Sequence, residues 1–318
     1  MQSGHHMKLF TGRSNPALSA EISRELAIPL GEVIIKTFSD GEIYVKYEEN
    51  IRNVDVFIIQ STNPPSDNII ELLLMIDAAR RASANSVTAV IPYYGYARQD
   101  RKDKPRVPIS ARLFLDTFEA AGANRMLTMD LHSPQIQGFV NIPFDNLYSR
   151  LVLIERLKRF DLDLQTGVVL APDMGSARMG QAYARYLDLG FALIDKRRPE
   201  PNKVEVVHLV GNLDGRHVLI IDDMIDTAGT LVSAAESALE HGARKVTAVA
   251  THGVLSGSAV ERLANSDIDK IIVTNTIKID AGDIGGKLEI ISVAKVFASS
   301  IERITAGQSL SSLFSLES

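Results

Sequence analysis

The chain contains no cysteine among its 318 residues. That absence excludes disulfides, thiolate metal sites and cysteine nucleophiles, and it agrees with a protein of the cytoplasm. No apolar run reaches membrane-spanning length, and no stretch has the organisation of a signal peptide. We therefore expect a cytoplasmic protein that has no membrane partner.

An excess of positive charge is also absent, because 34 basic residues face 39 acidic ones and the net charge is −5. Without a long basic stripe, a role in binding nucleic acid is not expected. The basic residues are local instead, at 98–106 and 196–198. The opening MQSGHHM is typical of an expression tag, so we expect the natural chain to begin near Met7.

Predicted strands and helices alternate along most of the sequence, which favours an α/β fold with largely parallel sheets. The length suffices for two domains. Pro143 interrupts the pattern, so we predict domains at 7–143 and 144–287. A last segment, 288–318, is expected to pack back on the first domain.

The most informative segment is VLIIDDMIDTAGT, residues 218–230. Its apolar run predicts a buried strand, 217–221, that leads into Asp222 and Asp223, and a helical pattern follows the loop. Backbone N–H groups and the positive end of a helix dipole meet in such a loop and favour a phosphate. The two acids then suit sugar hydroxyls, which together predicts a sugar-phosphate pocket. An ordinary strand–turn–helix with solvated acids is the alternative.

Polar residues also follow two other predicted strands. His132 comes after the strand 125–129, and Asp173 comes after the strand 168–171. Ligand sites of open α/β sheets lie at the carboxyl ends of strands, so these residues are candidates for holding a magnesium ion. The alternative is that each is bonded to the backbone of its own loop.

Two basic segments suit phosphates. Lys196 and Arg198 enter a loop that contains Pro199 and Pro201, and cations on such a loop can close over a polyphosphate. A solvated basic loop is the alternative. Arg98 and Gln99 suit a nucleotide phosphate and a base edge, respectively.

The predicted hairpin 32–47 offers an aromatic face at Phe38 and acceptors at Asp40 and Glu42, which suit an adenine ring. Nothing in the local sequence joins this tip to Arg98 and Gln99. A subunit interface could bring the two segments together. A β-turn and an aromatic core patch are the alternatives.

Taken in order, these segments resemble the class I ribose-phosphate diphosphokinases. The loop 218–230 alone resembles the phosphoribosyl-binding signature of the type I phosphoribosyltransferase fold, which several enzymes share. The likeness covers nearly the whole chain from about Met7. The matching strings are FSDGE at 38–42, IPYYGYARQDRK at 91–102, DLHSPQIQGF at 130–139, IDKRRPEPN at 194–202, GNLDGRHVLIIDDMIDTAGT at 211–230 and THGVLSG at 251–257.

The resemblance implies two type I phosphoribosyltransferase-like domains, each a mostly parallel sheet flanked by helices. It implies Mg²⁺-dependent transfer of the diphosphoryl group of ATP to the C1 hydroxyl of ribose 5-phosphate, which yields phosphoribosyl diphosphate and AMP for nucleotide biosynthesis. It also implies a homo-oligomer, a hexamer built from dimers, with inorganic phosphate and ADP as candidate effectors.

The resemblance assigns residues to these roles. The ribose 5-phosphate residues are Asp222, Asp223, Asp226, Thr227, Ala228, Gly229 and Thr230. The ATP residues are Arg98 and Gln99, with Phe38, Asp40, Gly41 and Glu42 of a neighbouring subunit. Lys196 and Arg198 are the implied catalytic cations, and His132 and Asp173 the implied metal residues. Ser309 and Ser311 are regulatory candidates.

One departure from the family follows Asp173, where a His or a similar residue and paired glycines are usual. This chain has Met174, Gly175 and Ser176 instead.

Two other classes of function stay open. A phosphoribosyltransferase would have no reason for an ATP site, and a non-enzymatic regulatory paralogue should have lost the basic catalytic loop.

Overall fold

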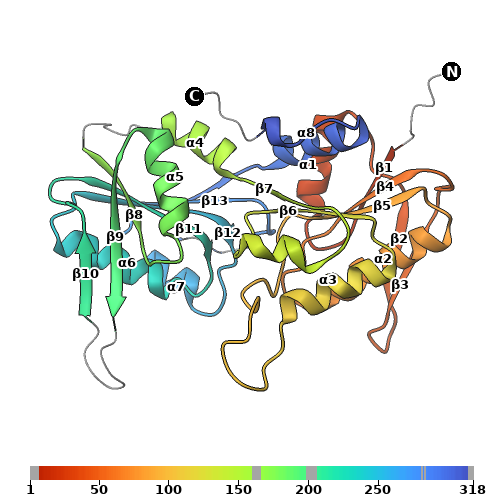
Figure 1. Ribbon diagram of the computed structural model, residues 1–318, viewed down its shortest axis with the longest axis horizontal. Coiled ribbons are helices and arrows are strands. Elements are labelled where there is room, and N and C mark those ends of the chain that lie inside the picture. Colours follow the sequence, from red (N-terminus) through yellow and green to blue (C-terminus); the bar gives the residue numbers. More distant parts are fainter. Residues whose placement is uncertain (1–6, 160–165, 198–205, 281, 283, 314–318) are drawn as a thin grey trace. The chain divides into compact units, whose positions relative to one another are not determined.

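The computed structural model describes residues 7–159, 166–197, 206–280, 282 and 284–313 (Figure 1). The chain forms two compact units. Unit 1 comprises the described residues up to Ser149, together with 276–278 and those from Ser292 onward. Unit 2 comprises the described residues of 150–275 and 279–291.

Unit 1 contains a five-stranded parallel sheet in the order β1-β4-β5-β6-β7. The strands are β1 (Met7–Thr11), β4 (Asp55–Ile59), β5 (Ser86–Ile91), β6 (Arg125–Met129) and β7 (Phe144–Leu147). A separate antiparallel hairpin joins β2 (Val33–Thr37) to β3 (Ile43–Tyr47). The helices are α1 (Pro16–Leu26), α2 (Asp67–Arg81), α3 (Ser110–Ala121) and α8 (Ala294–Thr305), with short 3₁₀ helices η1 (Pro134–Phe139) and η2 (Ser311–Leu313).

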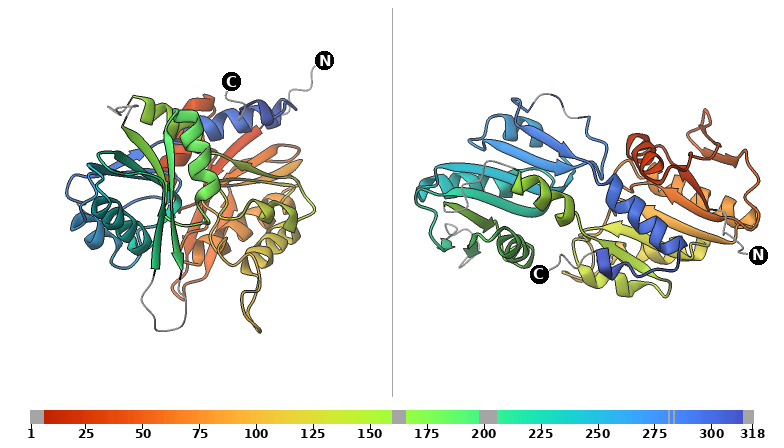
Figure 2. Two further views of the ribbon diagram at one scale, coloured as in Figure 1. Left: turned by 60° about the vertical axis from the view of Figure 1, so that its left-hand side comes forward. Right: turned by 90° about the horizontal axis from the view of Figure 1, so that it is seen from above.

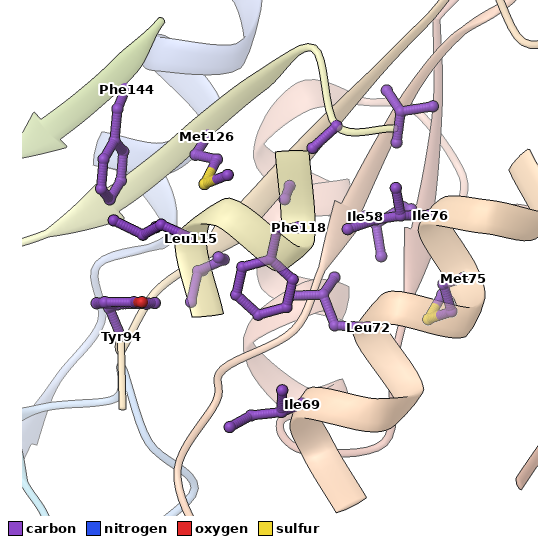
Figure 3. Packing of buried hydrophobic residues seen from close by; sticks show 14 of the residues in the cluster. Ile58, Ile69, Leu72, Met75, Ile76, Tyr94, Leu115, Phe118, Met126 and Phe144 are labelled. Atoms are coloured by element: carbon purple, nitrogen blue, oxygen red, sulfur yellow. The ribbon is translucent and has the colours of Figure 1, made fainter. Parts of the chain in front are cut away.

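The core of unit 1 forms where α2 and α3 pack against the sheet. Phe118 of α3 points toward Leu72 of α2, and both side chains are fully buried (Figure 3). Beside them, the rings of Tyr94 and Phe144 meet edge-on with centroids 6.4 Å apart. Burying each large apolar side chain contributes about 1.5–3 kcal/mol, so this cluster is a main source of stability for unit 1.

The end of the chain returns to unit 1. Helix α8 packs beside α1, although the two are far apart in sequence (Figure 2, right). The hydroxyl of Ser292 also donates a hydrogen bond to Glu21 of α1. Residues 288–291 do not take part, because they form β14 in the sheet of unit 2.

Unit 2 contains a seven-stranded sheet in the order β10-β9-β8-β11-β12-β13-β14. Only β10 is antiparallel to its neighbour among these described strands. The strands are β8 (Gly167–Ala171), β9 (Gly190–Arg197), β10 (Val206–Val210), β11 (His217–Ile225), β12 (Lys245–Gly253), β13 (Lys270–Thr274) and β14 (Leu288–Ile291). The helices are α4 (Arg150–Lys158), α5 (Ala177–Leu187), α6 (Gly229–Glu240) and α7 (Ala259–Ala264).

The central strand β11 is buried on both faces, which explains its unbroken apolar run. Val218 and Ile220 join the cluster beneath α6 and α7, whereas Leu219 and Ile221 join the cluster beneath α4 and α5. Figure 1 shows these helix pairs on opposite faces of the sheet. The alternation follows from the two-residue period of a strand.

Two features differ from the positions that the sequence indicated. Strand β11 extends to Ile225, because residues beyond 221 continue to pair with β12. Phe144–Leu147 forms β7 on the first sheet, so unit 1 ends at Ser149 rather than at residue 143. No helix among the described residues has both the length and the apolarity to cross a membrane.

Candidate functional site

Asp222 and Asp223 lie in the last part of β11, where the strand still pairs with β12, at the carboxyl end of the parallel strands. The Oδ1 atom of Asp222 accepts hydrogen bonds from the backbone N–H of Asp223 at 2.9 Å and from the hydroxyl of Ser176 at 2.8 Å. Both carboxylates are partly buried. The structure therefore places two carboxylates, of which Asp222 is held by hydrogen bonds, at the edge where α/β sheets bind ligands.

Burial raises the pKa of Asp222 to about 7, and the adjacent charge of Asp223 acts in the same direction. The hydrogen bonds from Ser176 and from the Asp223 backbone favour the ionised form and partly oppose this shift. A carboxylate that is this costly to ionise gains from a ligand that supplies hydroxyl groups or positive charge.

Ser176 connects this pair to Asp173, the sequence-predicted metal residue at the end of β8. The backbone N–H of Ser176 donates to Asp173 Oδ1 at 3.1 Å, and the Ser176 hydroxyl lies 3.2 Å from the same atom. The structure thus brings Asp173 and Asp222 into one network. In the sequence, Ser176 is only a departure from the family pattern, and its contacts with two carboxylates are not visible from a linear motif.

The loop that follows β11 is shaped for an anion. Ala228 adopts a left-handed conformation with φ of 62°, and α6 begins directly after it at Gly229. Ala228 at the N-cap gives no side-chain hydrogen bond to the start of α6, where N–H groups of the first turn can donate to an anion. Thr227 and Thr230 are exposed beside this helix start, where their hydroxyls can add donors for a phosphate.

Two further residues fix the loop from outside the predicted set. The hydroxyl of Ser256 donates to the Asp226 carboxylate, and the Ser256 N–H donates to the Asp226 carbonyl at 3.0 Å. Arg262 of α7 donates from Nη1 to the carbonyl of Thr227 at 2.9 Å. Sequence reasoning missed these contacts, because they join residues that lie 30 and 35 positions apart.

The donor set suits magnesium better than a softer metal, because carboxylate oxygens dominate it. No group of three or more His, Asp or Glu residues in the described part of the chain is arranged to hold a metal by itself. Magnesium is usually held by one or two carboxylates together with substrate phosphates and waters, so Asp173 with Asp222 or Asp223 fits that requirement.

In unit 1, the segment with Arg98 and Gln99 is fixed at the carboxyl end of β5. The Gly95 N–H donates to the Thr62 hydroxyl at 2.8 Å, and a Cβ at Gly95 would stand only 2.2 Å from the Thr62 carbonyl oxygen. Gln99 accepts a hydrogen bond from the Ser110 hydroxyl at the start of α3, and Arg98 is exposed.

The hairpin tip carries the other proposed ATP residues of unit 1. Its turn is closed by hydrogen bonds from the Phe38 N–H to the Glu42 carbonyl at 2.8 Å and from the Glu42 N–H to Asp40 Oδ1 at 3.0 Å. Gly41 has φ of 96°, a conformation that favours glycine. The Phe38 ring is 52% exposed and leans on Tyr44, with centroids 5.9 Å apart. An aromatic face is thus held open to a ligand.

The hairpin tip and the segment between β5 and α3 lie on separate parts of unit 1 (Figure 1). That these two segments meet between subunits stays a prediction.

The remaining predicted residues occupy several places. Lys196 is in β9, where its backbone pairs with Val207, and Arg198 lies outside the described residues. His132 is exposed in the loop after β6. Ser309 and Ser311 are exposed beyond α8, where the Ser309 carbonyl accepts from Arg303 at 3.1 Å. Their catalytic, metal and regulatory roles stay predictions.

The two sheets and the loop between β11 and α6 define an α/β protein with two type I phosphoribosyltransferase-like units. Residues 7–122 match the N-terminal domain of ribose phosphate pyrophosphokinase, and residues 196–315 match a phosphoribosyl synthetase-associated domain. A phosphoribosylpyrophosphate synthetase structure from Mycobacterium smegmatis is 37% identical, superposes with a TM-score of 0.89, and covers 95% of this chain and 99% of its own. The predicted fold class is confirmed.

Curated relatives lead to the same family. The ribose-phosphate pyrophosphokinase of Chlorobaculum tepidum is 51% identical over 97% of this chain and 95% of its own length. The enzyme of the same name from Aquifex aeolicus is 48% identical over 97% of this chain and 99% of its own. The chain belongs to the ribose-phosphate pyrophosphokinase family, and the resemblance read from its motifs is confirmed.

Proposed function

We propose that this protein transfers the diphosphoryl group of ATP to the C1 hydroxyl of ribose 5-phosphate, giving phosphoribosyl diphosphate and AMP. The observation that carries the proposal is the arrangement at the end of β11, where Asp222 and Asp223 precede the loop that leads to the start of α6 at Gly229. That arrangement has acceptors for sugar hydroxyls beside donors for a phosphate, which matches the two ends of a pentose phosphate.

Each part of the pocket has a separate task. The residues from Asp226 to Thr230 bind the 5-phosphate, and Asp222 and Asp223 bind the ribose hydroxyls. Because the sugar is anchored at both ends, its C1 hydroxyl is held in one direction for attack on the β-phosphorus of ATP. Orientation of this kind is a large part of catalysis in phosphoryl-type transfer.

Charge neutralisation supplies the other part. Lys196 and Arg198 stabilise the negative charge on the transferring oxygens in this scheme, and one well-placed donor is worth about 3 kcal/mol of barrier. In this scheme Asp173 and His132 would hold a magnesium ion, with help from Asp223, and the bound ion would supply positive charge to the phosphate chain.

The ATP site is assigned to unit 1. Arg98 binds a phosphate and Gln99 binds a base edge, and the carbonyl oxygen of Gln99 accepts a hydrogen bond from the Ser110 hydroxyl. The exposed ring of Phe38, contributed by a neighbouring copy of the chain, stacks on the adenine. This arrangement requires a homo-oligomer, and we propose a hexamer with phosphate and ADP as effectors that act near Ser309 and Ser311.

The decisive experiment is AMP release from ATP and Mg²⁺, measured with and without ribose 5-phosphate at several phosphate concentrations. We expect AMP to form only when the sugar is present. A phosphoribosyltransferase would form no AMP from these reactants and would instead release diphosphate when given phosphoribosyl diphosphate and a base. Absence of turnover in both assays would favour the non-enzymatic class.

A further inference from the structure

Ser176 directly precedes α5 and lies between two carboxylates that come from different strands. Its hydroxyl is 2.8 Å from Asp222 Oδ1 and 3.2 Å from Asp173 Oδ1. The Ser176 side chain is buried, with only 8% of the residue exposed. A buried hydroxyl in this position links the end of β11 to the end of β8.

The two contacts of Ser176 are not equivalent. A hydroxyl has one proton, and the shorter distance assigns it to Asp222. Asp173 is held separately by the Ser176 backbone N–H at 3.1 Å, a bond that any residue at this position except proline would keep. The hydroxyl is therefore needed for Asp222, while the backbone alone serves Asp173.

The surroundings leave little freedom for this link. A Cβ at Gly175 would stand 3.1 Å from Asp173 Oδ1, which is tighter than ordinary packing. Asp222 Oδ1 is also held by the Asp223 N–H at 2.9 Å. Neither Asp222 Oδ2 nor Asp173 Oδ2 has a hydrogen bond to a residue that the structure describes. Each carboxylate is thus fixed through one oxygen and presents the other.

We propose that Ser176 is a positioning residue for sugar binding. Its hydroxyl fixes the Asp222 carboxylate in the orientation that presents Oδ2 to the hydroxyls of ribose 5-phosphate, at a set separation from Asp173. The inference rests on the proposed function of the pocket and adds a residue that none of the motifs assigned to it.

Removal of the hydroxyl should affect the sugar and spare ATP. Without the donor, the Asp222 carboxylate can rotate away from its negative neighbour Asp173. Part of the binding free energy of the ligand is then used to restore the orientation. A hydrogen bond to a charged group is worth enough to change affinity about tenfold. We expect Ser176→Ala to weaken ribose 5-phosphate binding by about this factor, with ATP affinity unchanged and with Ser176→Thr restoring the sugar affinity.

The test compares full-length Ser176→Ala and Ser176→Thr with a matched control, Ser266→Ala. Ser266 also donates a hydroxyl hydrogen bond within unit 2, to the Leu263 carbonyl at 2.8 Å. It precedes β13 and so lies at the amino end of the strands, away from the pocket. Calorimetry measures ribose 5-phosphate binding directly, and AMP release gives KM and kcat for both substrates.

The outcomes separate the two proposals. If the unchanged protein does not bind ribose 5-phosphate, the proposed function fails. If it binds the sugar and Ser176→Ala binds equally well, the role of Ser176 alone is refuted. Equal losses for sugar and ATP, or an equal loss in Ser266→Ala, would also overturn it, because they indicate a general effect on the fold. Ser176→Gly keeps the backbone bond to Asp173 and replaces Ser176→Ala if that variant does not fold.

Discussion

Gly95 occupies a position where a single methyl group should disturb unit 1 and the proposed ATP segment. A Cβ there would stand 2.2 Å from the carbonyl oxygen of Thr62, about 1 Å inside ordinary contact. The strand ends cannot separate freely, because the Thr62 N–H donates to the Tyr93 carbonyl at 2.9 Å and the Gly95 N–H donates to the Thr62 hydroxyl at 2.8 Å. Gly95→Ala must therefore break or distort these bonds.

The expected cost follows from these contacts. Overpacking costs about 1–3 kcal/mol, and two strained hydrogen bonds of about 1 kcal/mol each place Gly95→Ala at the upper end, about 3 kcal/mol. For a unit of this size, 1 kcal/mol shifts Tm by about 2–4 °C, so we expect Tm to fall by about 6–12 °C. Arg98 and Gln99 follow within four residues, so the KM for ATP should rise while binding of ribose 5-phosphate to unit 2 is retained.

Thermal unfolding followed by circular dichroism, with substrate kinetics, checks both parts. Gly138→Ala is the matched control, because a Cβ at Gly138 meets no atom within 4 Å and should leave Tm and the KM for ATP unchanged. If Gly95→Ala unfolds at the temperature of the unchanged protein, the close approach to Thr62 does not constrain the loop. A lower Tm with an unchanged KM for ATP would show that the segment after Gly95 does not take part in nucleotide binding.

Three further predictions concern unit 2. Burial lowers the pKa of His217, so the unfolded chain binds the proton more readily than the folded protein does. The stability that the neutral ring contributes is therefore present above about pH 6.5 and is lost as pH falls below that value. Urea titrations at several pH values should show a weaker loss of stability with acid in His217→Gln, and an unaltered loss would refute the assignment. Lys196→Ala should lower kcat far more than it weakens ribose 5-phosphate binding, and equal losses would remove its transition-state role. Asp223→Ala should raise the KM for ribose 5-phosphate, and unchanged saturation by that sugar would contradict the pocket.

The parts of the fold that the sequence predicts are those with a local cause. The apolar run of β11 and the helical spacing of α6 each depend on neighbours in sequence. Strand β7 has no such signal, because Phe144–Leu147 is short and its pairing with β6 supplies its order. The boundary placed at Pro143 depended on that missing strand.

The candidate site also contains residues that local sequence predicts and contacts that it does not predict. Asp222, Asp223 and the loop to Thr230 are adjacent in sequence, so a motif can represent them and topology alone brings them to a ligand-binding edge. Their chemical state depends on residues that arrive from elsewhere in the fold. Ser176 comes from the start of α5 and orients Asp222, and Ser256 comes from the segment after β12 and holds Asp226.

The motif residues and the contacts from other elements affect ligand binding in different ways. The motif supplies the groups that touch the sugar phosphate, while the contacts from other elements set how rigidly those groups are held, and rigidity determines the cost of binding. A substitution at Ser176 can therefore alter sugar affinity while every residue of the motif is unchanged. Proteins that share the 218–230 motif but differ at the position of Ser176 should differ in how tightly they bind the pentose, and transplanting serine or glycine at that position between two of them would measure this contribution directly.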